Sequence, residues 1–215
     1  MIGSLSGGAI AADHMPAIGY RRAMVAGLPR WFSPTIAALL AATFALSLGA
    51  ALADGFGALA LVPDRVWRGE VWRLVTWVFA VPGPRALVAT AVVLYWFGGE
   101  LAARWREPSL RRFVAVIVGV AGGGTAALGA MVPRAHHLPY FGALALCDAL
   151  VIAWALEFPD RRLRVYGVLS IGGPILAYGT AGLTALAAIY FGPVAVLPEL
   201  LAAITALAWM SAWRL

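Results

Sequence analysis

The chain has 215 residues, of which 62% are hydrophobic and only 12% are charged. A soluble domain usually has about 45–50% apolar and about 25% charged residues, so this composition excludes an ordinary soluble enzyme. The formal net charge is +6, and every basic residue is an arginine. Because most of these arginines stand at the ends of long uncharged blocks, they indicate membrane topology and not nucleic-acid binding.

The N-terminal residues contain no apolar leader and end in arginine and aromatic residues, a pattern typical of an anchor at the membrane interface. We therefore expect a cytoplasmic tail with an interfacial anchor over residues 1–33 and a single membrane domain over 34–215. Ser33 before Pro34 predicts the start of the first spanning helix. Serine caps helix N-termini, and proline suits the first helical position.

Six apolar blocks predict six membrane-spanning helices and therefore an all-α polytopic membrane protein. The blocks cover residues 34–53, 86–99, 113–132, 139–158, 165–190 and 194–213. When both termini are assigned to the cytoplasm, most arginines fall on the cytoplasmic side, as the positive-inside rule requires. We expect a multi-pass protein of a bacterial inner membrane, with its N-terminus and C-terminus cytoplasmic.

Residues 54–85 are too polar to cross a bilayer and too rich in tryptophan for a solvated loop. They predict a large amphipathic first loop that lies in the membrane interface, with Trp72 and Arg73 as its anchors. In the third block, Gly119 and Gly123 have the GxxxG spacing that predicts close helix packing. In the fifth block, the glycines and proline at 172–174 predict either a kink or a turn back.

Three sequence runs occur in an order that resembles a known family. They are GEVWRLVT at 69–76, FGGEL at 97–101, and Gly142-Ala143 followed by Phe158-Pro159 and an arginine cluster. Together with the six blocks, these runs resemble the rhomboid superfamily, which includes intramembrane serine proteases and inactive relatives such as the derlins. The resemblance implies a six-helix rhomboid-like bundle with a large first loop.

The resemblance also shows what this sequence lacks. An active rhomboid has a serine nucleophile early in the fourth span and a histidine in the sixth, because a hydroxyl needs an adjacent base. Here Leu144, two residues after Gly142, aligns with the serine, and Glu199 aligns with the histidine. Ala202 and Ala206 follow Glu199 at the spacing of the family's small residues and imply a helix-packing face. The resemblance therefore implies a pseudoprotease without catalytic residues.

Asp148 is the other acidic residue that needs an explanation. It lies four residues after Leu144 and so on the same helix face, and an acid within a span costs about 2.5–3.5 kcal/mol on insertion scales. In one arrangement, Asp148 and Glu199 meet across the former active-site cleft. In the other, a carbonyl or a threonine satisfies a protonated Asp148, and Glu199 faces water.

We interpret the chain as a non-catalytic membrane protein that binds transmembrane helices, either as an adaptor or as an accessory subunit of a membrane complex. The alternatives are a rhomboid protease with a misaligned site and a small transporter that uses Asp148 and Glu199. His136 and His137 predict a solvated loop, and Cys147 a small buried hydrophobe. We expect the lipid bilayer and transmembrane helices as partners, with no cofactor, metal or nucleic acid.

Overall fold

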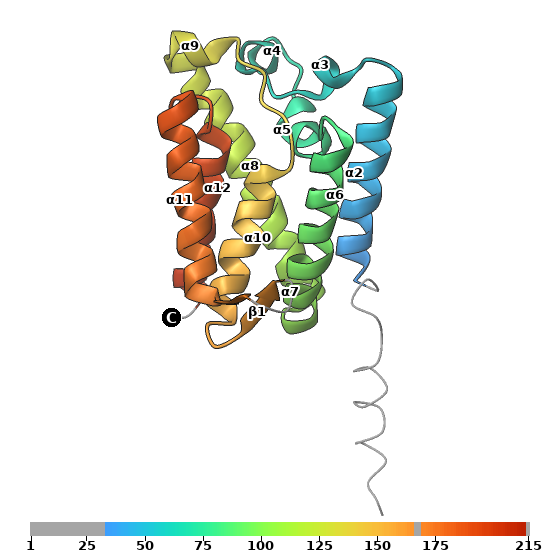
Figure 1. The fold of residues 1–215 in the computed structure, drawn as a ribbon. Helices are drawn as coiled ribbons and strands as arrows, with labels where there is room; N and C mark the ends of the chain where they lie inside the picture. Colours follow the sequence, from blue (N-terminus) through green and yellow to red (C-terminus); the bar gives the residue numbers. More distant parts are fainter. Residues whose placement is uncertain (1–32, 166–168, 214–215) are drawn as a thin grey trace, which may run out of the picture.

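The computed structural model describes residues 33–165 and 169–213, so the predicted N-terminal tail lies outside the described residues apart from Ser33. Within these ranges, four helical stretches are long and apolar enough to cross a membrane, which indicates a helical integral membrane protein. They are α2 (Pro34–Leu52), the continuous stretch Pro84–Arg104, α8 (Glu107–Met131) and α11 (Gly173–Phe191). Two shorter apolar helices, α10 (Leu144–Glu157) and α12 (Leu197–Trp213), run alongside them (Figure 1).

Helix α2 begins where the sequence predicts. The Ser33 hydroxyl accepts a hydrogen bond from the Ile36 amide at 3.3 Å, and Pro34 occupies the first turn. Farther along α2, the Ser47 hydroxyl donates to the Phe79 carbonyl at 2.8 Å and accepts from the Val81 amide at 3.0 Å. This buried hydroxyl fixes α2 to the segment that leads into the second spanning stretch.

The second spanning stretch consists of three helical segments. These are α6 (Pro84–Val93), the π-helical η3 (Leu94–Gly98) and α7 (Gly99–Arg104). The stretch is longer at both ends than the predicted block 86–99, because Pro84 starts the helix in the preceding loop and Glu100 continues it beyond the apolar run. Glu100 is tolerated there because it is ion-paired.

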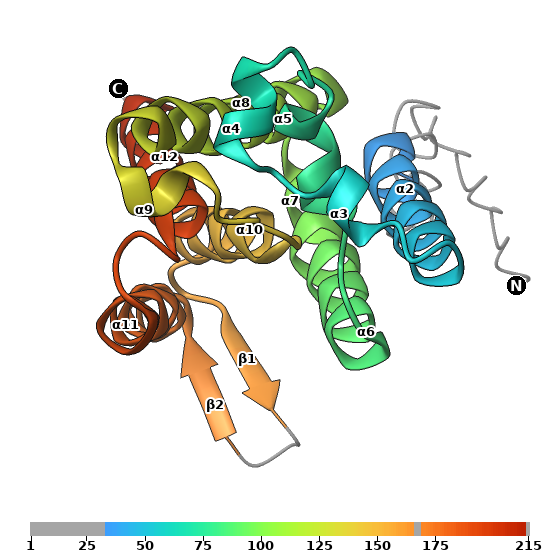
Figure 2. The ribbon, with the colours of Figure 1, turned by 90° about the horizontal axis from the view of Figure 1, so that it is seen from above.

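The central helix of the bundle is α10, which packs against α6, α8, α11 and α12. Figure 2 shows α10 in the middle of the molecule and α11 at its edge. In α12, Ala202 and Ala206 are completely buried, so the predicted packing face of this helix is confirmed. Small side chains let helix backbones approach closely, which stabilises helix pairs where lipid surrounds the bundle.

The predicted packing role of Gly119 and Gly123 is wrong within the described chain. A Cβ atom built at either position would meet no atom within 4 Å. The glycines of α8 that do permit close packing include Gly122, where a Cβ would lie 2.7 Å from the Leu74 carbonyl oxygen, and Gly129, which lies against Pro63. The face of α8 that packs against the first loop therefore carries Gly122 and Gly129, and the GxxxG pair lies on a different face.

The first loop folds into a cap of short helices at the upper end of the bundle in Figure 1. The cap contains α3 (Phe56–Leu59), α4 (Pro63–Trp67), α5 (Arg73–Thr76) and η2 (Trp77–Phe79), beside α9 (Pro133–His136). Trp72 is 53% exposed, as an interfacial anchor requires. Trp77 and Val78, by contrast, are buried in the core, so the loop is partly inserted into the bundle and does not simply lie on the membrane.

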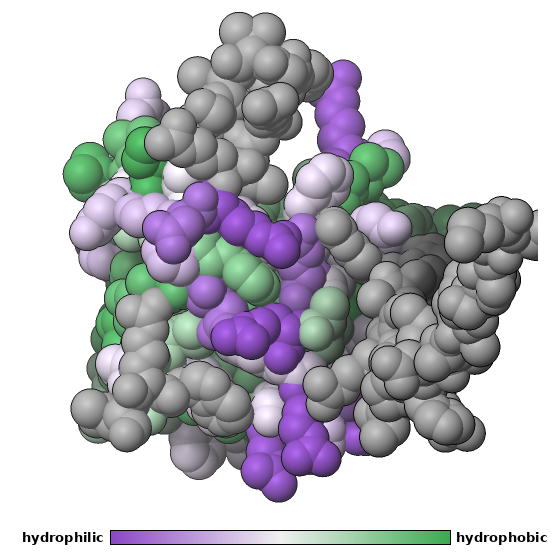
Figure 3. All heavy atoms as spheres, turned by 90° about the horizontal axis from the view of Figure 1, so that it is seen from below, coloured by the Kyte–Doolittle hydropathy of each residue, from purple (hydrophilic) through white to green (hydrophobic). Residues whose placement is uncertain are grey.

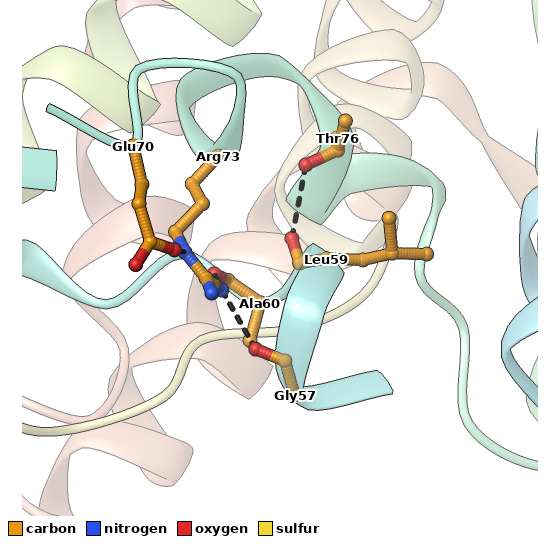
Figure 4. Close-up of polar contacts among 6 residues, drawn as sticks. All are labelled: Gly57, Leu59, Ala60, Glu70, Arg73 and Thr76. Atoms are coloured by element: carbon orange, nitrogen blue, oxygen red, sulfur yellow. Dashed lines mark hydrogen bonds and ion pairs between the residues drawn. The ribbon is translucent and has the colours of Figure 1, made fainter. Parts of the chain in front are cut away.

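Arg73 does not anchor the loop at the interface, and that prediction is wrong. Its side chain is only 2% exposed. Figure 4 shows the guanidinium among the loop segments, where Nη1 donates to the carbonyl oxygens of Gly57 and Ala60, each at 2.7 Å, and Nε donates to Glu70. Arg73 therefore holds the cap together from inside, because its several N–H groups satisfy carbonyls that no helix satisfies.

The fifth apolar block is not a single long helix. Residues Arg162–Val165 form β1 and Leu169–Gly172 form β2, an antiparallel pair with Arg162 opposite Gly172. Helix α11 begins at Gly173 with Pro174 in its first turn, so the predicted kink is wrong. A Cβ at Gly173 would lie 2.7 Å from the Ala155 carbonyl oxygen, so glycine allows α11 to start against α10.

The opposite end of the bundle carries an ion-paired cluster. The Glu100 carboxylate accepts hydrogen bonds from Trp154 Nε1 at 2.9 Å and Arg161 Nη1 at 2.7 Å, and Arg104 pairs with Glu157 at 2.9 Å. Figure 3 shows hydrophilic side chains gathered on this end. These contacts connect α7 to α10 and to the segment that leads into β1.

Candidate functional site

A cavity of about 470 Å³ lies between α10, α11 and the start of α12. Most of its lining is apolar, and its polar side chains are two acids and two threonines. The lining residues are Leu144, Asp148, Thr180, Leu183, Thr184, Ala187, Phe191, Ala195, Val196 and Glu199. The cavity therefore brings together three residues that the sequence singles out, one from the start of α12 and two from α10.

Helix α11 forms the outer wall of this cavity and is loosely held. Only 6% of the apolar 18-residue stretch of α11 is buried against the rest of the molecule. The Thr184 hydroxyl donates to Asp148 Oδ2 at 3.2 Å and to the Thr180 carbonyl at 3.1 Å, and so connects α11 to α10. A helix with little buried surface opens more readily than a core helix.

The structure combines parts of the two arrangements left open for the acidic residues. Asp148 has a threonine partner, as one arrangement expects, but it also shares a cavity with Glu199, as the other expects. Glu199 does not point fully to solvent, because its Oε2 atom is buried and has no hydrogen-bond partner among the described residues. Both acids lie in the first two turns of their helices.

Leu144 also borders a second, smaller cavity of about 240 Å³ between α6 and α10. Its lining is almost entirely apolar: Val81, Pro82, Ala86, Ala89, Thr90, Val93, Phe141, Gly142, Ala143, Leu144 and Cys147. Gly142 has a φ of +92°, a left-handed conformation that favours glycine. The side chain of Leu144 is 63% exposed, and Cys147 is buried as predicted.

The serines and histidines of the described helices lie elsewhere. Neither cavity is lined by a serine or a histidine from the described part of the chain. Ser47 bonds to backbone groups near Phe79, and the Ser211 hydroxyl donates to the Ala208 carbonyl at 2.9 Å. The structure therefore aligns no described hydroxyl with an imidazole at either cavity.

The two adjacent histidines contact an acid that the sequence spacing does not reveal. His136 Nε2 lies 3.4 Å from Asp64 Oδ1, and His137 Nδ1 lies 3.7 Å from Asp64 Oδ2. Asp64 also pairs with Arg68 at 2.8 Å. Within the described ranges, no group of three or more potential ligands is arranged to hold a metal ion. These contacts connect α4 to α9 across the cap.

Tyr140 was not singled out from the sequence, yet it borders the α9 end of the site. Its backbone pairs with Leu61 in the first loop, at 2.9 and 3.0 Å. Its hydroxyl donates to the Val194 carbonyl, between α11 and α12, at 2.8 Å. Tyr140 thus joins the cap, the start of α10 and the α11–α12 connection. A lone tyrosine two residues before Gly142 gives no sequence signal for this contact.

No protein-family model and no curated protein matches this chain.

Proposed function

We propose that this protein is a non-catalytic, rhomboid-like membrane protein that binds transmembrane helices of partner proteins in the two cavities beside Leu144. The observation that carries the proposal is the exposed Leu144 side chain, which borders both cavities. Transmembrane helices associate through close packing and through polar groups that lipid cannot satisfy. The cavities offer both, because apolar walls surround the Asp148 and Glu199 carboxyls.

The position of α11 supports a lateral entry route for a partner helix. Its outward face carries exposed large apolar side chains, which include Tyr178, Leu186 and Ile189. Because little of α11 is buried, displacing it from α10 exposes little core surface. A partner helix could then contact Leu144 without unfolding the bundle. We propose the same groove whether the protein acts as an adaptor or as a subunit of a membrane complex.

The rhomboid-like assignment has its own support in the structure. The short helices α10 and α12 complete a six-helix arrangement with the four longer stretches, and the first loop forms a cap. Leu144 and Glu199 occupy the serine and histidine positions of the resemblance and border one cavity. We further propose that the end with Arg104 and Arg161 faces the cytoplasm, since arginines are enriched on that side of membranes.

A transporter is the second candidate, because two carboxyls share one cavity. Such pairs can carry protons in membrane proteins. Proton flux into proteoliposomes that stops in the Asp148→Asn variant would favour this candidate. Flux equal to that of empty liposomes would exclude it.

Photo-crosslinking in native membranes tests the proposed function. A photoreactive amino acid at position 144 should form adducts with membrane proteins, and these adducts should be sparse when the same group stands at Val120. Val120 is the matched control because it is also an exposed apolar residue, on α8, and borders neither cavity. Equal protein adducts at both positions, or only lipid adducts at position 144, would contradict the proposal.

A further inference from the structure

The larger cavity has a chemistry that an all-apolar helix does not satisfy. The Glu199 Oε2 atom is buried without a hydrogen-bond partner among the described residues, and Asp148 has a single 3.2 Å bond from Thr184. A buried carboxylate oxygen that lacks a donor is costly in an apolar environment. No arginine lines the cavity in the described chain, so its own residues supply no cation.

From these observations we infer that the preferred partner helix carries an arginine that binds between Asp148 and Glu199. This inference rests on the proposed function and specifies the chemistry of the partner. Two carboxylates in one apolar cavity repel each other when both are ionised, and a cation between them removes that repulsion. A guanidinium has five donors in a planar fork, so it can donate to both carboxylates at once.

The position of the acids along their helices defines where the arginine should lie. Asp148 is four residues from the start of α10, or about 6 Å along the helix axis at 1.5 Å per residue. Glu199 is in the first turn of α12. Asp148 accepts a hydrogen bond from Thr184, which lies near the middle of α11 (Gly173–Phe191), so this carboxyl lies within the membrane-spanning part of the bundle. An arginine at this depth is costly in lipid, so pairing with the two acids would favour binding of the partner helix.

The size and form of the cavity fit such a side chain. Its volume of about 470 Å³ exceeds that of the second cavity, about 240 Å³, which has no acidic lining residue. The aliphatic stem of an arginine would lie against Leu183 and Val196, and the guanidinium would reach the acids. We thus assign the larger cavity, which holds Asp148 and Glu199, to recognition of the partner's arginine. The smaller cavity, which has no acidic lining residue, would pack against the apolar part of the partner helix.

Binding of single-span peptides in lipid nanodiscs tests the inference. The peptides are leucine-rich helices of about 20 residues with arginine, glutamine or leucine near the middle, at the depth of Asp148. Energy transfer from a donor on the protein to an acceptor on the peptide reports binding. We expect the arginine peptide to bind about ten-fold more tightly than the leucine peptide, the scale of polar contacts between membrane helices.

Variants of the protein locate that preference. Asp148→Asn combined with Glu199→Gln should bind the arginine and leucine peptides equally, while the leucine peptide binds as it does to the wild type. Asp160→Asn, an exposed acid outside the cavity, is the matched control and should keep the preference. Retained binding of the leucine peptide also shows that the double variant is folded.

The possible outcomes separate the inference from the proposed function. If all three peptides bind the wild type equally, or if the double variant keeps the preference for arginine, the inference is overturned and the helix-binding function stands. If no peptide binds the wild type, both are overturned. The comparison of peptides on the wild type requires no variant, so a variant that fails to fold does not prevent the test.

Discussion

Replacing Arg73 by alanine should destabilise the protein more than replacing any arginine on its surface. The side chain is 2% exposed and connects the 70–73 part of the cap to the segment that holds Gly57 and Ala60. The variant leaves the carbonyls of Gly57 and Ala60 without their donor and Glu70 without its ion pair. The matched control is Arg68→Ala in the same loop, because Arg68 also forms an ion pair but is 70% exposed.

The contacts determine the size of the effect. A hydrogen bond to a charged group contributes about 1.5–3 kcal/mol, and Nη1 makes two such bonds to backbone carbonyls. Because Glu70 is partly exposed, its pairing with Arg73 adds little. We therefore expect Arg73→Ala to lower the free energy of unfolding by about 3–5 kcal/mol, chiefly through the loss of these two bonds. Arg68→Ala should lower it by about 0.5 kcal/mol or less.

Reversible unfolding in mixed micelles, followed by tryptophan fluorescence, measures both values. The readout is favourable because Trp77 directly follows α5, which Arg73 begins. Arg73→Lys should give an intermediate loss, since lysine keeps the charge but lacks the planar fork. If Arg73→Ala and Arg68→Ala lower the stability equally, the guanidinium does not hold the cap together and the reasoning is refuted.

Two further stability predictions follow from contacts elsewhere. Gly122→Ala should cost about 1–3 kcal/mol, because its Cβ would lie 2.7 Å from the Leu74 carbonyl oxygen, whereas Gly119→Ala should change stability by about 0.5 kcal/mol or less. The same unfolding assay measures both, and equal effects would mean that α8 packs differently. Tyr140→Phe removes the 2.8 Å hydrogen bond to Val194 and should cost about 1 kcal/mol. Unchanged unfolding and unchanged amide exchange between α11 and α12 would argue against that bond.

Several features of the fold could be predicted because they depend on local patterns. The Ser33 cap, the apolar stretches and the buried face of α12 follow from capping chemistry, hydrophobicity and small-residue spacing. Helical periodicity alone places Leu144 and Asp148 on one face, and they line one cavity. Glu199 was singled out only through the resemblance to the rhomboid superfamily, and it lines the same cavity.

Other features depend on contacts between distant segments, and the sequence pattern was ambiguous for them. Arg73 beside an exposed tryptophan has the pattern of an interfacial anchor, and only the carbonyls of another loop segment make it a buried group. The GxxxG spacing at Gly119 predicts a packing face, but several glycines crowd α8 and the spacing cannot say which of them faces the first loop. Strand β2 (Leu169–Gly172) consists of residues that also suit a membrane helix, so hydrophobicity did not separate the strand from the helix that follows it.

The most direct test of helix binding beside Leu144 is to fill the groove and measure the loss of affinity. Leu144 borders both cavities and its side chain is exposed, so Leu144→Trp should be accommodated without loss of fold while it occupies the space for a partner. In nanodiscs, the affinity for the leucine peptide should fall about ten-fold or more, which corresponds to about 1.4 kcal/mol. Val120→Trp should leave it unchanged. An affinity that is the same for wild type and Leu144→Trp would contradict helix binding at this position.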